Sequence, residues 1–178
     1  MNTMPAFLDF EASSLSLDSY PIEVAWNHED GSIEDHLISP AHIESWTDWD
    51  PEAERIHGIK REEILSRGES PLVICKIMND QLAGKTVYTD APQFDGMWLS
   101  KLFSAPVNAR PEFELRHIDE LLVQSICPKA PGRMEGLTKI GALKQEARRQ
   151  KPSQHRAGWD VEYLVQVWRL AESEAETP

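Results

Sequence analysis

The chain has 178 residues, of which 40% are hydrophobic and 27% are charged, and its formal net charge is −12. This length and apolar content suffice for one folded domain with a buried core, so the composition excludes a disordered polypeptide. No apolar run approaches the roughly 18 residues of a membrane span, and residues 1–7 lack a secretory signal pattern, so we expect a cytoplasmic protein. The acidity argues against a broad basic surface for nucleic acid, but it allows a small local cleft.

The first part of the chain is predicted to form three antiparallel strands. Residues Ala6–Glu11 are an apolar run behind Pro5, which predicts a buried strand. The alternating segment Ile22–Trp26 predicts a second strand, and Asp30-Gly31 predicts a hairpin turn into a third strand over residues 32–39. Because helical patterns follow these strands, the order of elements favours an α/β or α+β domain.

Helical patterns and two more strands fill the rest of the chain. In residues 71–82, Leu72, Val73, Ile77 and Met78 have helical spacing. The acidic end, residues 171–178, is predicted to be a disordered tail of a single domain that spans residues 1–178. The expected helices are 51–67 (two short pieces interrupted at 56–59), 71–82, 93–103, 119–126, 136–150 and 156–172, and the expected strands are 85–89 and 113–118.

Two carboxylates on the first strand are candidate metal ligands. Side chains two positions apart on a strand point the same way, so Asp9 and Glu11 are expected to project together while Phe10 enters the core on the other side. Two carboxylates held this close repel each other unless a cation lies between them, and oxygen-rich sites suit Mg²⁺ or Mn²⁺. Taken alone, the pair is more typical of an ordinary strand edge than of a metal site.

Three further candidates lie at predicted helix starts. Asp95 is expected in a first helical turn, where a carboxylate is a favourable partner of the helix dipole. Asp160 is also expected in a first turn, with Arg156 one turn earlier as a possible ion-pair partner. His155 lies just before this helix, in a position typical of a loop residue. None of the three indicates a site by itself.

Together and in this order, these residues resemble the DEDDh group of 3′–5′ exonucleases. That group includes the proofreading subunits of bacterial replicative polymerases, oligoribonuclease and ribonuclease T. An H-G-I segment that is common in these enzymes is present at residues 57–59, and the resemblance runs from Ala6 to Trp168. The family motifs are D-x-E followed by Leu, F-D at a helix start and H-x-x-x-x-D; they are matched by Asp9, Glu11 and Leu15, by Phe94 and Asp95, and by His155 and Asp160.

The resemblance implies a ribonuclease H-like fold, in which helices flank a central mixed sheet. It also implies two divalent cations, Mg²⁺ or Mn²⁺, with His155 as the general base for the attacking water. The backbone at Ala12 would meet the terminal 3′-hydroxyl, Leu15 would wedge against the last base, and Phe94 would join them in substrate binding. The substrate would be single-stranded or short nucleic acid, the products nucleoside 5′-monophosphates and the enzyme a possible homodimer. The implied metal ligands are Asp9, Glu11, Asp95 and Asp160.

Departures from the family pattern leave the substrate open. Asp90-Ala91 stands where relatives often have His-Asn, and Ser13-Ser14 stands where many have Thr-Gly. RNA and DNA remain alternatives, as do a non-catalytic binding module on the same fold and a phosphodiesterase for small nucleotides. The basic run Lys144–Lys151 either contacts phosphates or is a solvated helix face. Trp46 and Trp49 either stack on bases, pack in the interior or form a partner surface.

Overall fold

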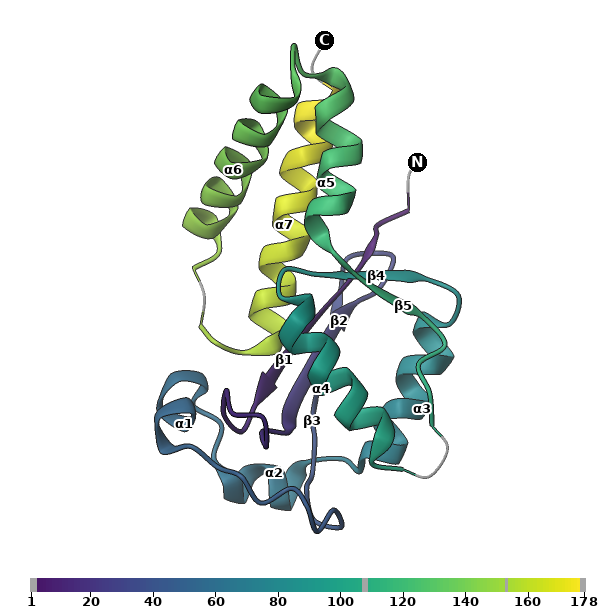
Figure 1. The fold of residues 1–178 in the computed structure, drawn as a ribbon, viewed down its shortest axis with the longest axis vertical. Coiled ribbons are helices and arrows are strands. Elements are labelled where there is room, and N and C mark those ends of the chain that lie inside the picture. The colour runs from purple at the N-terminus through teal and green to yellow at the C-terminus, as the bar shows by residue number, and fades with distance from the viewer. Residues whose placement is uncertain (1–2, 107–108, 153, 177–178) are drawn as a thin grey trace.

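A five-stranded mixed sheet forms the centre of the protein in a computed structural model that describes residues 3–106, 109–152 and 154–176. The sheet order is β3-β2-β1-β4-β5 (Figure 1). The first three strands pair antiparallel, whereas β4 runs parallel to β1 and β5 parallel to β4. The mixed α/β sheet expected from the sequence is therefore confirmed. The strands are β1 (Ala6–Ala12), β2 (Pro21–Asn27), β3 (Ile33–Leu37), β4 (Thr86–Thr89) and β5 (Glu114–His117).

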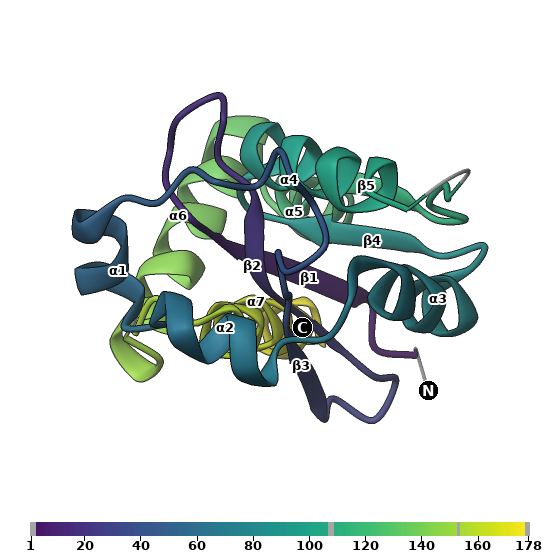
Figure 2. The ribbon, with the colours of Figure 1, turned by 90° about the horizontal axis from the view of Figure 1, so that it is seen from below.

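Helices cover both faces of this sheet. Side chains of α3 and α4 share one apolar core with the sheet, and those of α5, α6 and α7 share another. Figure 1 shows α5, α6 and α7 side by side at the upper end, and α1 and α2 at the opposite end, which is nearest the viewer in Figure 2. The helices are α1 (Pro51–His57), α2 (Arg61–Arg67), α3 (Pro71–Leu82), α4 (Pro92–Ser104), α5 (Ile118–Ile126), α6 (Arg133–Gln150) and α7 (Ala157–Glu176), with a short 3-10 turn at Cys127–Lys129.

Strand β1 divides its side chains between the two cores. Leu8 and Phe10 are buried in the core under α3 and α4, while Phe7 is buried in the core under α7. Because alternate residues of a strand point to opposite faces, Asp9 and Glu11 lie on the α7 face. The predicted inward direction of Phe10 is confirmed.

Local signals explain where the short helices α1 and α2 begin and end. Asp50 caps α1 by accepting the N–H of Glu52 at 2.9 Å, and Gly58 ends this helix in the left-handed conformation, with φ of 71°. A side chain other than glycine is strained in that conformation, so glycine is the natural residue there. Helix α2 begins after Lys60. The predicted pair of short helices is confirmed.

Helix α3 is present where the sequence predicts it, but only part of its helically spaced apolar set faces inward. Leu72 and Val73 are exposed, whereas Ile74, Cys75, Met78 and Leu82 are buried against the sheet and α4. The apolar spacing predicted the helix correctly. The side that meets the sheet is set by how α3 packs, which spacing alone does not reveal.

The C-terminal helix is longer than expected. It continues to Glu176, and Ala171 is completely buried against the core of α5 and α6. An ion pair between Lys139 and Glu174 also links α6 to this last part of α7. The expectation of disorder from residue 171 onward is therefore wrong as far as Glu176, and residues 177–178 lie outside the described part of the chain. No helix in the described part is long and apolar enough to cross a membrane.

The tryptophans serve mainly as core residues. Trp26, Trp46, Trp98 and Trp168 are buried, and Trp46 stacks on Tyr20 with ring centroids 5.2 Å apart. The packing alternative is therefore confirmed for Trp46. Because these four side chains are buried, they are not available for the partner surface of a homodimer.

Candidate metal and catalytic site

Three carboxylates from two elements meet on the α7 face of the sheet. Asp9 and Glu11 project from β1, and Asp160 projects from the first turn of α7, which packs across β1 and β2. Each carboxylate offers an oxygen that lies within 4.8 Å of the other two. Residues that are distant in sequence are thus brought together in the combination that the motifs predicted. We call Asp9, Glu11 and Asp160 the carboxylate triad.

Burial and the repulsion between neighbouring carboxylates disfavour the ionised forms of Asp9 and Glu11 when no cation is bound. Burial raises the pKa of Asp9 well above its usual value, and the charges of Asp95, Asp160 and Glu11 add to the shift. Burial also raises the pKa of Glu11 to about 8, reinforced by the charges of Asp160 and Glu23 and opposed by Arg156. A divalent cation would offset these costs, because its charge favours the ionised form of each carboxylate around it. The oxygen-only donor set suits Mg²⁺ or Mn²⁺.

The predicted fourth ligand, Asp95, lies beside the triad. Its side chain is buried in the first turn of α4 and accepts a hydrogen bond from the Thr89 hydroxyl. Burial raises the pKa of Asp95 to about 7, and the Thr89 hydrogen bond opposes this shift. Thr89 Oγ1 also accepts the N–H of Ala91 at 3.0 Å, so the end of β4 orients Asp95. The charge of Asp95 raises the pKa of Asp9, although Asp95 is not one of the three residues whose oxygens lie within 4.8 Å of one another.

A further acidic residue, Asp90, belongs to the same electrostatic environment. Burial raises the pKa of Asp90, and so does the charge of Asp160, while Arg148 and Lys144 oppose the shift. Asp90 in turn raises the pKa of both Asp9 and Asp95. In the sequence, Asp90 stands out only as a departure from the family pattern. Its position between the end of β4 and the start of α4 was the available signal.

The basic residues around the site have partners other than those predicted. Asp160 pairs with Arg148 at 3.2 Å, not with Arg156, and the Arg148 guanidinium lies 3.7 Å from the centre of the Tyr163 ring. Arg156 pairs instead with Glu23, which stands opposite Glu11 in the β1–β2 register. The predicted Arg156–Asp160 pair is wrong, since it was inferred from spacing within one helix, whereas the observed partners come from β2 and α6.

His155 lies in the segment that precedes α7, and its side chain is exposed. Its backbone has φ of +50°, a left-handed conformation. The H-G-I segment at residues 57–59 lies close enough for the charge of His155 to act on His57. Burial lowers the pKa of His57 to about 4; the charge of Glu54 opposes this shift, and the charges of Arg156 and His155 add to it. His57 Nδ1 accepts the N–H of Ile59 at 3.0 Å. His57 and His155, which are distant in sequence, are therefore near each other in the fold.

The predicted substrate-binding residues come from two elements that are tied together. Ala12 is buried at the end of β1, while Leu15 in the following loop is 76% exposed. Phe94 on α4 is partly exposed and stacks on Trp98, with ring centroids 5.8 Å apart. The Trp98 indole N–H donates to Ser19 Oγ at 3.0 Å, which links α4 to the loop that carries Leu15. Two apolar side chains are thus available on neighbouring elements.

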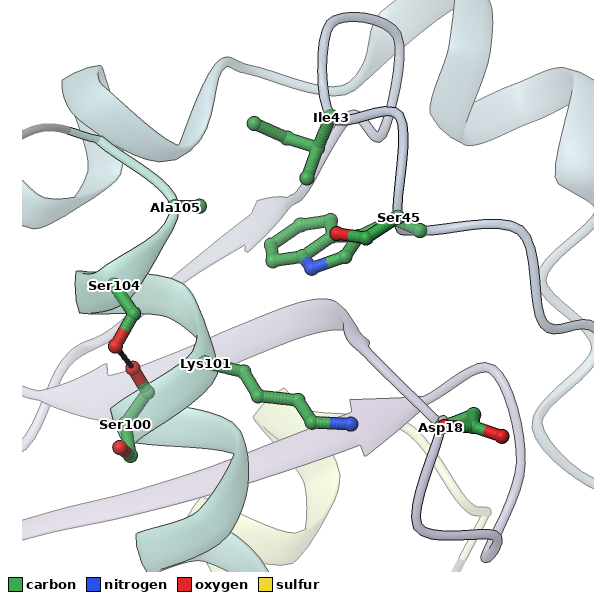
Figure 3. Close-up of a pocket in the computed structure, with 8 residues that line it drawn as sticks. Asp18, Ile43, Ser45, Ser100, Lys101, Ser104 and Ala105 are labelled. Atoms are coloured by element: carbon green, nitrogen blue, oxygen red, sulfur yellow. Dashed lines mark hydrogen bonds between the residues drawn. The ribbon is translucent and has the colours of Figure 1, made fainter.

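A separate pocket of about 310 Å³ lies between α4, the β1–β2 loop and the segment around Trp46 (Figure 3). Lys101 extends across it and donates to the carbonyl oxygens of Leu17 and Ser19, so its ammonium group holds the β1–β2 loop. None of the triad residues lines this pocket. Lys101 therefore supports the loop that carries Leu15.

Comparisons with family models and with curated proteins each gave no significant match. Similar folds do occur among solved structures. An exonuclease I from Methylocaldum szegediense has a TM-score of 0.65 and 20% identity over 94% of this chain and 40% of its own. The zinc-bound complex of E. coli exonuclease I with single-stranded DNA has a TM-score of 0.65 and 13% identity over 98% and 41%. Its complex with a dT13 oligonucleotide has a TM-score of 0.63 and 16% identity over 97% and 41%.

These likenesses confirm the expected ribonuclease H-like fold. The identities are too low to transfer an activity, so the comparison establishes the arrangement of the sheet and helices. The chain also spans only about two fifths of the length of these structural relatives.

Proposed function

We propose that the protein is a metal-dependent 3′–5′ exonuclease of the DEDDh type that shortens single-stranded nucleic acid. The carboxylate triad carries this proposal, because three carboxylates from β1 and α7 have oxygens within 4.8 Å of one another. The structural relatives are exonuclease I proteins, some in complex with single-stranded oligonucleotides such as dT13 and dA16. They support single-stranded DNA as the first substrate to test, with RNA as its comparison.

The residues of the site fit the two divalent cations that such chemistry requires. Asp9, Glu11 and Asp160 would hold them, with Asp95 completing the set from α4. Bound Mg²⁺ or Mn²⁺ would supply positive charge that acidifies the attacking water and stabilises the departing 3′ oxygen. The mutual repulsion of these carboxylates favours a bound cation, whose positive charge offsets it.

His155 is the proposed general base. It is exposed beside the start of α7, so a water molecule and the substrate have access to its imidazole ring. A histidine is well suited to this role, because its usual pKa is near the working pH. His155 takes a proton from the attacking water, whose oxygen forms a bond to the phosphorus of the terminal nucleotide. The bond from that phosphorus to the 3′ oxygen of the preceding nucleotide breaks, the 3′ oxygen takes up a proton from solvent, and a nucleoside 5′-monophosphate is released.

The proposed binding residues hold the end of the strand. The backbone at Ala12 meets the terminal 3′-hydroxyl, and Leu15 and Phe94 contact the last base. Leu15 and Phe94 are exposed on two linked elements, which supports this role, since an exposed apolar surface favours stacking of an unpaired base. The role does not require a broad basic surface.

A small-nucleotide phosphodiesterase is the second candidate function. The net charge of −12 favours it, since long strands bind acidic proteins weakly. Cations whose charges act on the carboxylates of the site are also already paired, Arg148 with Asp160, Lys144 with Asp119 and Arg156 with Glu23. A series of oligonucleotide lengths separates the two functions: rates that rise with length support the exonuclease, and activity confined to dinucleotides supports the phosphodiesterase.

The test is a time course on denaturing gels with 5′-labelled single-stranded DNA and RNA of one sequence. We expect a ladder that shortens from the 3′ end with Mn²⁺ and no cleavage with EDTA. The Asp9→Ala variant should be inactive, and Asp80→Ala, which removes an exposed carboxylate paired with Lys76, should match the parent protein. Absence of cleavage of every substrate at high protein concentration would favour a non-catalytic binding module instead.

A further inference from the structure

Glu23 is a buried carboxylate that the proposed reaction does not use. It lies on β2 directly opposite Glu11, and its side chain is only 1% exposed. A carboxylate placed beside an acidic site adds repulsion, and its charge does raise the pKa of Glu11. Such a costly position calls for a compensating role.

Both oxygens of Glu23 are used to hold the start of α7. Arg156 Nε donates to the two carboxylate oxygens at 3.0 Å each, and Arg156 Nη2 donates to Oε1 as well. The backbone N–H of Ala157, the first residue of α7, donates to Oε2 at 2.9 Å. A planar guanidinium against a carboxylate fixes both distance and orientation. We call these contacts the Glu23 clamp.

The residue just before the clamp has an unusual backbone. Among the described residues, His155 alone has a positive φ without being glycine, at +50°. A side chain makes this conformation unfavourable, so surrounding contacts must maintain it. Arg156 and Ala157 immediately follow His155, and the Glu23 clamp holds both. Its contacts are therefore in the right place to maintain the conformation.

We propose that Glu23 is a positioning residue, which through Arg156 and the N–H of Ala157 holds His155 in the orientation needed for proton transfer. This inference rests on the proposed function, in which His155 is the general base. Glu23 touches neither substrate nor metal in this role. It acts by tying the segment between α6 and α7 to β2, where Glu23 stands opposite Glu11.

A double-mutant cycle tests this role. The four proteins are the parent, Glu23→Gln, His155→Ala and the double variant, each assayed for kcat on single-stranded DNA with saturating Mn²⁺. Glu23→Gln keeps the shape of the side chain but removes its charge. We expect it to lower kcat by about tenfold in the parent and by less than about twofold in the His155→Ala background, because residues acting through one another are not additive. Equal losses in both backgrounds would overturn the proposal.

A second variant and a control separate positioning from folding. Arg156→Lys keeps the positive charge but lacks the fork that contacts both oxygens, so it should lower kcat like Glu23→Gln with little change in KM. It also replaces Glu23→Gln in the cycle if that variant does not fold. Glu52→Gln neutralises the exposed partner of Arg55 and should leave kcat unchanged. A kcat for Arg156→Lys equal to that of the parent would contradict the role of the clamp.

One measurement does not depend on activity. Amide hydrogen exchange at Ala157, followed by NMR, should become about tenfold faster in Glu23→Gln and stay unchanged in Glu52→Gln, since the amide loses a charged acceptor. Unchanged exchange at Ala157 would overturn the clamp even if the parent protein is an active nuclease. An inactive parent protein with faster exchange in Glu23→Gln would instead remove the proposed function and leave the structural clamp intact.

Discussion

The two faces of β1 have opposite characters along the same few residues. On the α3 and α4 face, Leu8 and Phe10 are buried in a continuous apolar core. On the α7 face, Phe7 is buried in a second core, but Asp9 and Glu11 follow it and meet Asp160. One strand thus contributes packing on one side and chemistry on the other. The comparison teaches that an acidic cluster can be tolerated in the centre of a sheet when the opposite face of the same strand is well packed.

The largest expected effect is on the α7 face. Asp9→Ala should abolish Mg²⁺- or Mn²⁺-dependent hydrolysis and leave the fold intact, because it removes a ligand and also relieves repulsion among buried carboxylates. Nuclease assays with circular dichroism on the same samples check both parts. Full activity in this variant would show that the triad is not the reaction centre.

Removal of the proposed base should reduce activity less than removal of a metal ligand, but the reduction should still be large. His155→Ala should lower kcat by roughly 10²–10⁴-fold, the usual contribution of general base catalysis, with metal binding largely retained. A pH–rate profile and a Mn²⁺ titration on this variant check the two parts separately. If the pH–rate profile keeps the shape of the parent's, His155 is not the base.

A substitution on the α3 and α4 face of β1 should lower the stability of the protein and leave its activity unchanged. Leu8 is completely buried, so Leu8→Ala should lower the free energy of unfolding by about 2–5 kcal/mol. The kcat measured well below the thermal midpoint should stay close to that of the parent. Urea unfolding and nuclease assays provide the comparison. A large loss of kcat in folded Leu8→Ala would break the division of labour between the two faces.

The smallest expected effect is a pH dependence of stability without metal. Burial and neighbouring charges raise the pKa of Glu11 from 4.5 to about 8 and that of Asp95 from 3.8 to about 7. In the pH range between the ordinary and the raised pKa of each group, the folded state binds more protons than the unfolded state. The free energy of unfolding therefore falls as the pH rises through this range. With EDTA, thermal midpoints should therefore decline from pH 5 to pH 8.

Saturating Mn²⁺ should raise the midpoint at pH 8 and flatten this decline, because a ligand of the folded state stabilises it. Glu11→Gln removes one of the raised groups and should reduce the decline in EDTA. A midpoint that rises between pH 5 and pH 8 in EDTA would contradict the pKa directions of the carboxylates. No shift with saturating Mn²⁺ would argue against a preformed metal site.

Much of the local structure could be predicted from the sequence. Alternation along β1 placed Asp9 and Glu11 together on the face opposite Phe10, and the interruption at residues 56–59 divided the helical stretch 51–67 into α1 and α2. These predictions succeeded because strand periodicity and helix termination depend on backbone geometry over a few neighbouring residues. The same rules did not give the inward face of α3, which depends on the surface it meets.

The composition of the site was decided only by the tertiary structure. The motifs named Asp160 as a partner of Asp9, but the packing of α7 across β1 is what brings their oxygens within 4.8 Å. The pairing of Arg156 with Glu23 was not visible in any local pattern. Such contacts depend on strand register and on the angle at which helices cross the sheet. The sequence by itself therefore determined which face of β1 carries the acidic residues, and the folded chain determined which residues meet them there.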